Sequence, residues 1–275
     1  MGGPDEVREY GIIGYPLQYT LSPPIHNAAF QALGIPARYR AYPVKDIQEG
    51  VRLIREIPLE GVSITIPHKM AIMNLLDGLD EVASQISAVN TVVRQGRGFI
   101  GYNTDWIGAV RALEEVTSLQ GRRVLLVGAG GGARAVAYGV RSRGGELWVT
   151  SKDGEKGEVL AHSFGGQFLP WDQRGKFSLG VVVNATPLGG NGLEDLLPLP
   201  TEALHEGMVV MDLVYHPLKT RLLREAQGRG CRTIDGLRML LYQGGEQFAL
   251  WTGESPPWEV MEEVIYGQDK ADKGA

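Results

Sequence analysis

The chain has 275 residues, a formal net charge of −5, 38 glycines and one cysteine. This length accommodates two domains, and interspersed charges without a basic tract argue against nucleic acid or an anionic membrane as a partner. A lone cysteine excludes an intramolecular disulfide, no apolar run reaches the length of a membrane span, and the first residues do not resemble a signal peptide, so we expect a cytoplasmic protein.

The first hundred residues alternate between strand-like and helix-like patterns. Strands are expected over residues 10–14, 37–44, 61–66, 89–94 and 99–102, the last two joined as a hairpin around Gln95-Gly-Arg-Gly98. Helices are expected from Ser22, over 46–56 with Asp46 as the cap, from Pro67-His68-Lys69, and over 106–116. Strands that alternate with helices in this way predict an α/β domain.

The clearest motif follows an apolar strand at residues 124–127. Gly128, Gly130 and Ala133 form G-x-G-x-x-A at the start of a predicted helix. In such a motif the first glycine allows the tight turn, the second lets a pyrophosphate approach the backbone, and the third small residue lets helix and strand pack closely. A second strand at 146–150 completes the context, so this segment predicts a dinucleotide site.

The alternation continues to the end of the chain and predicts a second α/β unit. Further strands are expected at 167–169, from Leu179 into a polar loop that ends at Gly189, at 208–215 and at 231–234. Further helices are expected at 155–164, 218–227 and 237–251.

Polar residues at strand ends of the first unit are the candidates for chemistry. Lys69 follows Thr65 and Pro67 where a strand stops, and Asn90 and Asp105 stand at turns after apolar strands. Asp105 could hold a lysine ammonium through a charge-assisted hydrogen bond. The structural alternatives are a solvated lysine at a helix start, an Asx-turn and an N-cap, and Ser22 also has the alternative of an N-cap. The histidines show no metal-ligand spacing, so we expect no metal site.

Taken together, the motifs resemble the shikimate dehydrogenase family over nearly the whole chain. The matching segments are Gly14-x-Pro16, Ser22-Pro23, His26-Asn27, Thr65-Ile-Pro-His-Lys69, Ala88-Val-Asn-Thr91, Asn103-Thr-Asp105, Gly128-Ala-Gly-Gly-Gly-Ala-Arg134, Asn184-Ala-Thr186, Asp212-Leu-Val-Tyr215, and Gly236 through Met239 to Gln243. No single segment is diagnostic, but their joint occurrence in this order is highly specific.

The resemblance implies reduction of 3-dehydroshikimate to shikimate with NADPH, in aromatic amino-acid biosynthesis. It makes Lys69 and Asp105 the catalytic pair. It assigns substrate contacts to Thr20, Ser22, Thr65, Asn90, Tyr215 and Gln243. It assigns cofactor contacts to Gly128, Ala129, Gly130, Gly131, Gly132, Ala133, Ser151, Lys152, Asn184 and Gly236.

The resemblance also implies two α/β domains. Residues 1–104 with 237–275 would form a substrate-binding catalytic domain, and residues 105–236 a Rossmann-like NADP-binding domain. The C-terminal helices would return to the first domain. The partner is a small-molecule substrate, and the sequence leaves a homodimer open.

The chain departs from the family's usual pattern in three places. Thr20 and Ser63 stand where the family usually has serine and asparagine, which affects substrate range. Ser151-Lys152-Asp153 replaces Asn-Arg-Thr after the second cofactor strand, which affects cofactor preference. Two alternatives therefore remain: an NAD-dependent quinate/shikimate dehydrogenase, and a catalytically silent nucleotide-binding homologue.

Overall fold

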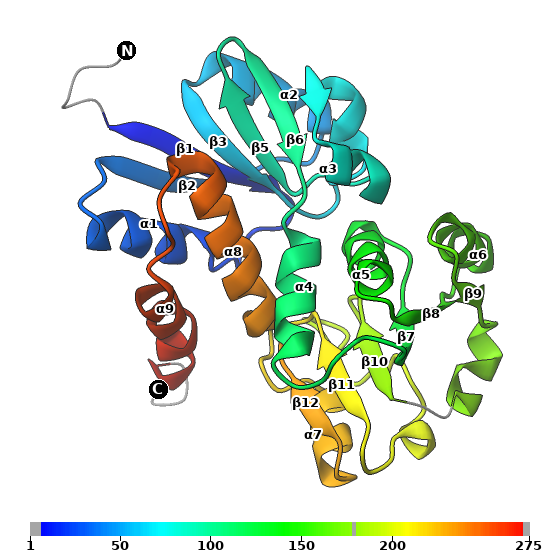
Figure 1. The fold of residues 1–275 in the computed structure, drawn as a ribbon. Helices are drawn as coiled ribbons and strands as arrows, with labels where there is room; N and C mark the ends of the chain where they lie inside the picture. The colour runs from blue at the N-terminus through cyan, green and yellow to red at the C-terminus, as the bar shows by residue number, and fades with distance from the viewer. Residues whose placement is uncertain (1–6, 178–179, 272–275) are drawn as a thin grey trace. The chain divides into compact units, whose positions relative to one another are not determined.

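The computed structural model of the chain describes residues 7–177 and 180–271 (Figure 1). It divides into two compact units: the first contains the residues up to Thr104 and from Gln243 onward, and the second contains Asp105–Tyr242. Among the described residues, no helix is both long and apolar enough to cross a membrane. The sequence predicts that a strand begins at Leu179, and this residue lies outside the described residues.

A six-stranded sheet forms the centre of the first unit, in the order β2-β1-β3-β5-β6-β4. Its strands are β1 (Arg8–Gly14), β2 (Ala37–Pro43), β3 (Leu59–Ile64), β4 (Gly78–Leu79), β5 (Thr91–Gln95) and β6 (Gly98–Tyr102). Strand β1 is parallel to β2 and β3, while β5 is antiparallel to β3 and β6, so the predicted hairpin is confirmed. The carboxyl ends of the three parallel strands meet at one edge, where ligands of α/β proteins bind.

The helices of the first unit are α1 (Ser22–Ala32), α2 (Ile47–Glu56), α3 (Glu81–Ile86), the later part of α8 (Gly236–Thr252) and α9 (Trp258–Ala271). Asp46 caps α2 as predicted, because its carboxylate accepts a hydrogen bond from the Gln48 amide at 3.0 Å. The helix expected from Pro67-His68-Lys69 is wrong: a 3₁₀ helix, η1 (Ala71–Leu75), forms there instead. The turn signal Asp77-Gly78 follows directly and limits this segment to about one turn.

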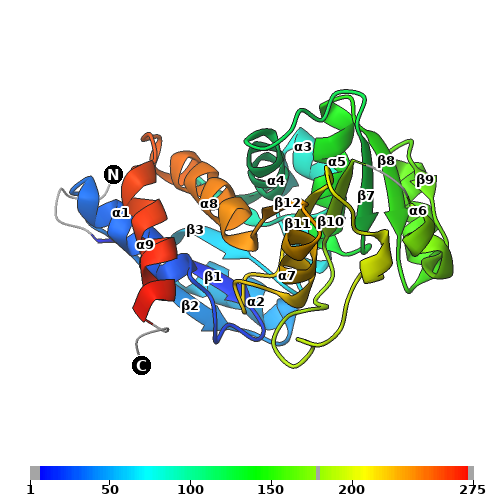
Figure 2. The same cartoon turned by 90° about the horizontal axis from the view of Figure 1, so that it is seen from below.

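Different helices cover the two faces of this sheet (Figures 1 and 2), and different side chains lie beneath them. Beneath α2 lies an aliphatic core that includes Ile13, Val62 and Ile64. Beneath α1 and α8 lies an aromatic cluster, in which the buried His26 ring stacks on Tyr39 at 4.6 Å between centroids. Alternate residues of β1 and β3 project to opposite faces, so each strand contributes to both layers.

The second unit contains a six-stranded sheet in the order β12-β11-β10-β7-β8-β9, and its paired strands are parallel. The strands are β7 (Arg123–Val127), β8 (Glu146–Thr150), β9 (Gln167–Phe168), β10 (Val181–Asn184), β11 (Val209–Asp212) and β12 (Arg232–Ile234). This is the doubly wound order of dinucleotide-binding domains, so the Rossmann-like fold is confirmed.

Helices cover both faces of this sheet. Its helices are α4 (Asp105–Glu114), α5 (Gly131–Ser142), α6 (Gly154–Ser163), α7 (Arg221–Gly228) and the first turns of α8. Leu126 and Val183 face the core formed with α4 and α5, whereas Leu125 and Val182 face the core formed with α7. Burial on both faces explains why these strands are apolar without alternation.

Several boundaries differ from the sequence expectation, and three of them have an identifiable physical reason. Strand β11 ends at Asp212 rather than Tyr215, because the Asp212 carboxylate accepts the Val214 amide at 3.0 Å and turns the chain. Helix α7 begins at Arg221 rather than 218, since the Thr220 hydroxyl caps it. The units divide within α8 rather than at its start.

The division of α8 follows from its packing. Met239 belongs to the core of the second unit. Phe248 and Trp251 lie in the aromatic cluster of the first unit, where their rings pack at a tilt against those of Phe30 and Tyr10 respectively. The first part of α8 therefore packs in the core of the second unit, and its later part packs in the first unit.

Candidate active site

Lys69 lies just beyond the carboxyl end of β3, in a segment fixed by backbone and side-chain bonds. The Val89 amide donates to the Lys69 carbonyl at 2.8 Å, and the Thr65 carbonyl accepts the His68 amide at 2.9 Å. The buried His68 ring is bonded through Nε2 to the Val44 carbonyl at 2.7 Å. These bonds fix the backbone on which the half-buried Lys69 side chain is mounted.

Asn90 is the centre of a buried polar cluster. Its Oδ1 accepts from the Thr104 amide at 2.7 Å and from the Thr91 hydroxyl at 2.8 Å. Its Nδ2 donates to the Thr104 hydroxyl at 2.9 Å and to Gln243 Oε1 at 3.2 Å. A single Asx-turn would not need these long-range partners, so Asn90 joins β5, the segment after β6 and helix α8.

Asp105 is the residue directly after Thr104, and it is the first residue of α4. Its side chain is 3% exposed. The preceding Asn103 donates to the Ala88 carbonyl at 2.8 Å, so the chain entering α4 is held on the Ala88–Asn90 segment. A carboxylate at this end of a helix is favoured by the helix dipole.

Ser22 does not serve as an N-cap. Leu21 occupies that position of α1 without a side-chain cap bond, and Ser22 is itself the first residue of the helix. The buried Ser22 side chain is instead hydrogen-bonded to the Tyr39 hydroxyl. The Thr20 hydroxyl accepts a long bond, 3.4 Å, from the Ser22 amide. Both hydroxyls thus lie on the loop that follows β1.

The glycine motif has the geometry of a phosphate-binding turn. Gly128 adopts φ +119°, and an added Cβ would lie 3.0 Å from the Ala185 carbonyl oxygen, so a glycine is needed there. An added Cβ at Gly130 or Gly132 would meet nothing within 4 Å. Helix α5 begins at Gly131 with no side-chain cap, and the amides of a helix's first turn have no partner within the helix, which suits them to an anion. The residues present therefore fit a pyrophosphate.

Two cofactor candidates after β8 differ in environment. Ser151 is buried, whereas Lys152 is exposed and its ammonium lies 5.7 Å from the centre of the Trp171 ring. The Asp153 carboxylate caps α6 by accepting the Lys156 amide at 3.1 Å, and it pairs with the Lys156 ammonium at 2.7 Å. Lys156 also lowers the pKa of Asp153. Asp153 is thus engaged by α6, and Lys152 remains the cation of this strand end.

Asn184 is fully buried, and its side chain organises the loop after β10. Its amide donates to the Leu188 carbonyl at 3.1 Å and to Asp212 at 2.8 Å, while its oxygen accepts from the Thr186 amide and hydroxyl. Any contribution of Asn184 to cofactor binding therefore acts through the loop it shapes.

Asp212 and Thr220 lie beside Asn184 at the carboxyl edge of the sheet. They are not among the candidate site residues predicted from the sequence. The Thr220 hydroxyl donates to Asp212 at 2.7 Å. Burial raises the pKa of Asp212 to about 6, against three hydrogen bonds that lower it. Gly236 is equally constrained, because an added Cβ would lie 2.7 Å from the Leu213 carbonyl oxygen. Tyr215 lies beyond β11 and is half-buried.

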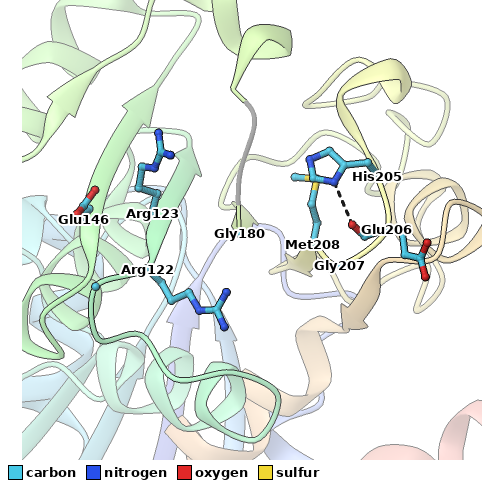
Figure 3. A pocket seen from close by; sticks show the side chains of 9 residues that line it. Arg122, Arg123, Glu146, Gly180, His205, Glu206, Gly207 and Met208 are labelled. Atoms are coloured by element: carbon cyan, nitrogen blue, oxygen red, sulfur yellow. Dashed lines mark hydrogen bonds between the residues drawn. The ribbon is translucent and has the colours of Figure 1, made fainter.

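A cavity of about 510 Å³ lies elsewhere in the second unit (Figure 3). It is lined at the amino ends of β7, β8, β10 and β11, by residues that include Arg122, Arg123, Glu146 and His205. These charged and polar side chains are exposed and of mixed sign. The glycine motif occupies the opposite, carboxyl end of the strands, so this cavity is separate from the predicted cofactor site. Within residues 7–177 and 180–271 no group of three side chains is arranged to hold a metal ion.

Comparisons with known proteins point in the same direction as these residues. Residues 12–92 match the model of the shikimate dehydrogenase substrate binding domain, and residues 236–266 match that of the shikimate 5'-dehydrogenase C-terminal domain. A shikimate dehydrogenase (NADP(+)) of Thermococcus kodakarensis is 45% identical over 269 residues, which cover 93% of this chain and 95% of the relative.

Solved structures agree over the same length. The shikimate 5-dehydrogenase of Thermus thermophilus, in complex with NADP(H) and shikimate, has a TM-score of 0.87 at 35% identity and covers 94% of this chain and 99% of that one. The quinate dehydrogenase of Corynebacterium glutamicum, in complex with NAD, has a TM-score of 0.86 at 32% identity and covers 95% of this chain and 99% of that one. With relatives this similar over nearly its whole length, the chain belongs to the shikimate dehydrogenase family.

Proposed function

We propose that this protein catalyses the reversible NADPH-dependent reduction of 3-dehydroshikimate to shikimate. The observation that carries this proposal is the Val89–Asn90 segment: the Val89 amide holds the Lys69 backbone, and the buried Asn90 side chain holds the backbone of Thr104, immediately before Asp105. The two residues that the family resemblance assigns to catalysis, Lys69 and Asp105, are thus both present, and hydrogen bonds hold the segments that carry them. The family match over 93% of the chain supports the same activity.

Each candidate site residue then has a defined role in the reaction. Bound NADPH supplies a hydride to the ketone carbon of the substrate. Lys69 places an ammonium at the oxygen that becomes an alkoxide, and Asp105 supplies the matching carboxylate. Thr20, Ser22, Thr65, Asn90, Tyr215 and Gln243 bind the hydroxyls and carboxylate of the substrate.

NADP is the preferred cofactor in this proposal. The turn from Gly128 to Ala133 holds the pyrophosphate, and Lys152 and Ser151 bind the 2′-phosphate, where NAD enzymes normally place an acid. Asp153 offers little repulsion, because its carboxylate is engaged by Lys156 and by the start of α6. The unit Asp105–Tyr242 acts as the NADP-binding domain, and the unit formed by the residues up to Thr104 and from Gln243 onward acts as the substrate domain, in the cytoplasm.

A steady-state assay tests this function directly. We expect reduction of NADP⁺ with shikimate to exceed reduction of NAD⁺ with shikimate, and both to exceed the rates with quinate. Four measurements, of each substrate with each cofactor, distinguish the proposed function from the two alternatives. A preference for quinate and NAD⁺ would favour the quinate-type alternative, and absence of turnover with a bound dinucleotide would favour a silent homologue.

The residue at position 152 offers a test of cofactor choice. We expect Lys152→Ala to raise KM for NADP on the order of tenfold, the loss of one charge-assisted bond, and to leave KM for NAD nearly unchanged. Asp153→Asn is the matched variant, since it keeps the cap of α6 and removes the charge; it should favour NADP slightly. Equal changes for both cofactors in Lys152→Ala would contradict a contact with the 2′-phosphate.

A further inference from the structure

An aromatic side chain, Trp171, lies next to the lysine proposed to bind the 2′-phosphate. Strands β8 and β9 are paired in parallel, with Val149 opposite Phe168. The same register continued along both segments places Lys152 opposite Trp171, just beyond the ends of the two strands. The Lys152 ammonium lies 5.7 Å from the centre of the Trp171 ring. This distance is within the range of a cation–π interaction, for which tryptophan is the best aromatic partner.

The protein holds Trp171 more firmly than it holds Lys152. Trp171 is the first residue of the 3₁₀ helix η2 (Trp171–Lys176), and its half-buried side chain packs against the core formed with α7. The Arg174 guanidinium lies 3.9 Å from the centre of the Trp171 ring and donates to the carbonyls of Trp171 and Pro198. Lys152, by contrast, is exposed. The ring is therefore a fixed surface beside a side chain that is otherwise solvated.

The acid that follows Lys152 in the sequence is engaged by another lysine. The Asp153 carboxylate accepts the Lys156 amide at 3.1 Å and pairs with the Lys156 ammonium at 2.7 Å. Lys156 accordingly lowers the pKa of Asp153. The charge of Asp153 is thus directed to the start of α6, while the Lys152 ammonium lies by the Trp171 ring.

A lysine gains more from such a surface than an arginine does. Its ammonium is a point charge on a flexible four-carbon stem and lacks the rigid fork of a guanidinium. Fixing a side chain of this kind when a ligand binds costs entropy and weakens affinity by about twofold to tenfold. A ring face that attracts the ammonium restricts it before the ligand arrives, so less entropy is lost on binding. Because an ammonium has three N–H donors, those not directed at the ring can bind phosphate oxygens.

We propose that Trp171 is a positioning residue for cofactor choice: its ring holds the Lys152 ammonium in place for the 2′-phosphate, and so strengthens binding of NADP but not of NAD. This inference rests on the proposed contact of Lys152 with the 2′-phosphate. The ring gives Lys152 part of the fixed geometry that an arginine has by itself, at a strand end where the family usually has arginine.

The test compares two ligands that differ only in the 2′-phosphate, adenosine 2′,5′-bisphosphate and adenosine 5′-monophosphate. Their Kd values are measured by calorimetry on the full chain. Trp171→Met replaces the ring with a flexible apolar side chain that fills irregular space in a core. We expect this variant to weaken binding of the bisphosphate about threefold and to leave binding of the monophosphate unchanged. Trp171→Phe keeps a ring with a weaker attraction for cations and should lie between the two.

Lys152→Ala supplies the matched background. By itself it should weaken binding of the bisphosphate about tenfold and leave the monophosphate unchanged. Because Trp171 acts through Lys152, adding Trp171→Met to Lys152→Ala should weaken bisphosphate binding no further. If the double variant instead shows the full additional loss, the ring acts independently of the lysine and the inference is wrong.

Other outcomes also decide between the explanations. Equal weakening of both ligands by Trp171→Met would mean that the ring contacts adenosine or only supports the fold. Tighter bisphosphate binding would mean that the ring draws Lys152 away from the phosphate. Either result overturns the inference while the contact of Lys152 stands. If Lys152→Ala does not distinguish the two ligands, it is the proposed contact with the 2′-phosphate that fails.

A measurement on the wild-type protein keeps the inference testable if Trp171 variants fold poorly. The protons on Cε of Lys152 are identified in the nuclear magnetic resonance spectrum by their loss in Lys152→Ala, a change at an exposed position. A group above an aromatic face is shielded, so these protons should resonate upfield of those of Lys176, another exposed lysine. The shift should persist when the bisphosphate is bound. Equal shifts for the two lysines would overturn the inference.

Discussion

Lys69→Ala is expected to lower kcat for shikimate oxidation by roughly 10²–10⁴, the usual contribution of a positioned acid–base group. The loss is chemical and not structural, because the Lys69 backbone is held by the Val89 amide and its side chain is only half-buried. Thermal unfolding and NADP binding should therefore stay close to wild type. Steady-state rates with saturating shikimate and NADP⁺ measure the effect.

The double variant shows whether Lys69 and Asp105 act together. If they serve one step, Lys69→Ala with Asp105→Asn should lose much less than the product of the two single losses. Lys176→Ala removes an exposed lysine of the second unit and serves as the control for a change of charge. An unchanged kcat in folded Lys69→Ala would remove this lysine from the mechanism.

Acidification is expected to weaken the fold through His26, a residue of the aromatic cluster. Burial lowers the pKa of His26 to about 3, although a hydrogen bond with Gln247 partly offsets this. In the unfolded chain His26 has its ordinary pKa of about 6.5. Below that pH the unfolded chain therefore binds a proton at His26 that the folded chain does not bind. The free energy of unfolding therefore falls by about 1.4 kcal/mol for each pH unit from about 6.5 down to about 3.

Asp212 has the opposite effect on the pH dependence of stability. A His26 variant is therefore needed to isolate the contribution of His26. The raised pKa of Asp212, about 6, makes the folded protein lose stability as pH rises from about 3.8 to about 6. His26→Gln keeps a polar group but does not titrate, and Asp212 affects both proteins equally. Between about pH 7 and about pH 4.5, denaturant unfolding should show the wild type losing about 2–3 kcal/mol more than His26→Gln. Parallel pH profiles would show that His26 is protonated in the folded state.

Much of the architecture follows from local sequence. The strand at 146–150 was predicted with both bounds correct, and the motif beginning at Gly128 was placed between a strand and a helix, as observed. These predictions succeed because periodicity, small residues at a tight turn, and capping by Asp46 act over a few residues. The family, the fold and the NADP-type activity were likewise expected from ordered short motifs.

Other features depend on contacts between distant residues. A helix was expected after Lys69 but is a 3₁₀ turn, and α8 was assigned to one domain although its side chains serve two cores. Ser22 could have been a cap from sequence, but it begins the helix and bonds Tyr39. Asp153 could have opposed the cofactor phosphate, but it caps α6 and pairs with Lys156.

The sequence by itself determined which residue types stand at the strand ends, because turns, caps and hydrophobic periodicity are local. The tertiary structure alone decided how those residues are oriented. The amides of Asn90 and Gln247 have no preferred direction in an isolated segment. They acquire one only when the Thr104 amide and the Asn90 carbonyl are buried against them, since a buried donor or acceptor must find its partner.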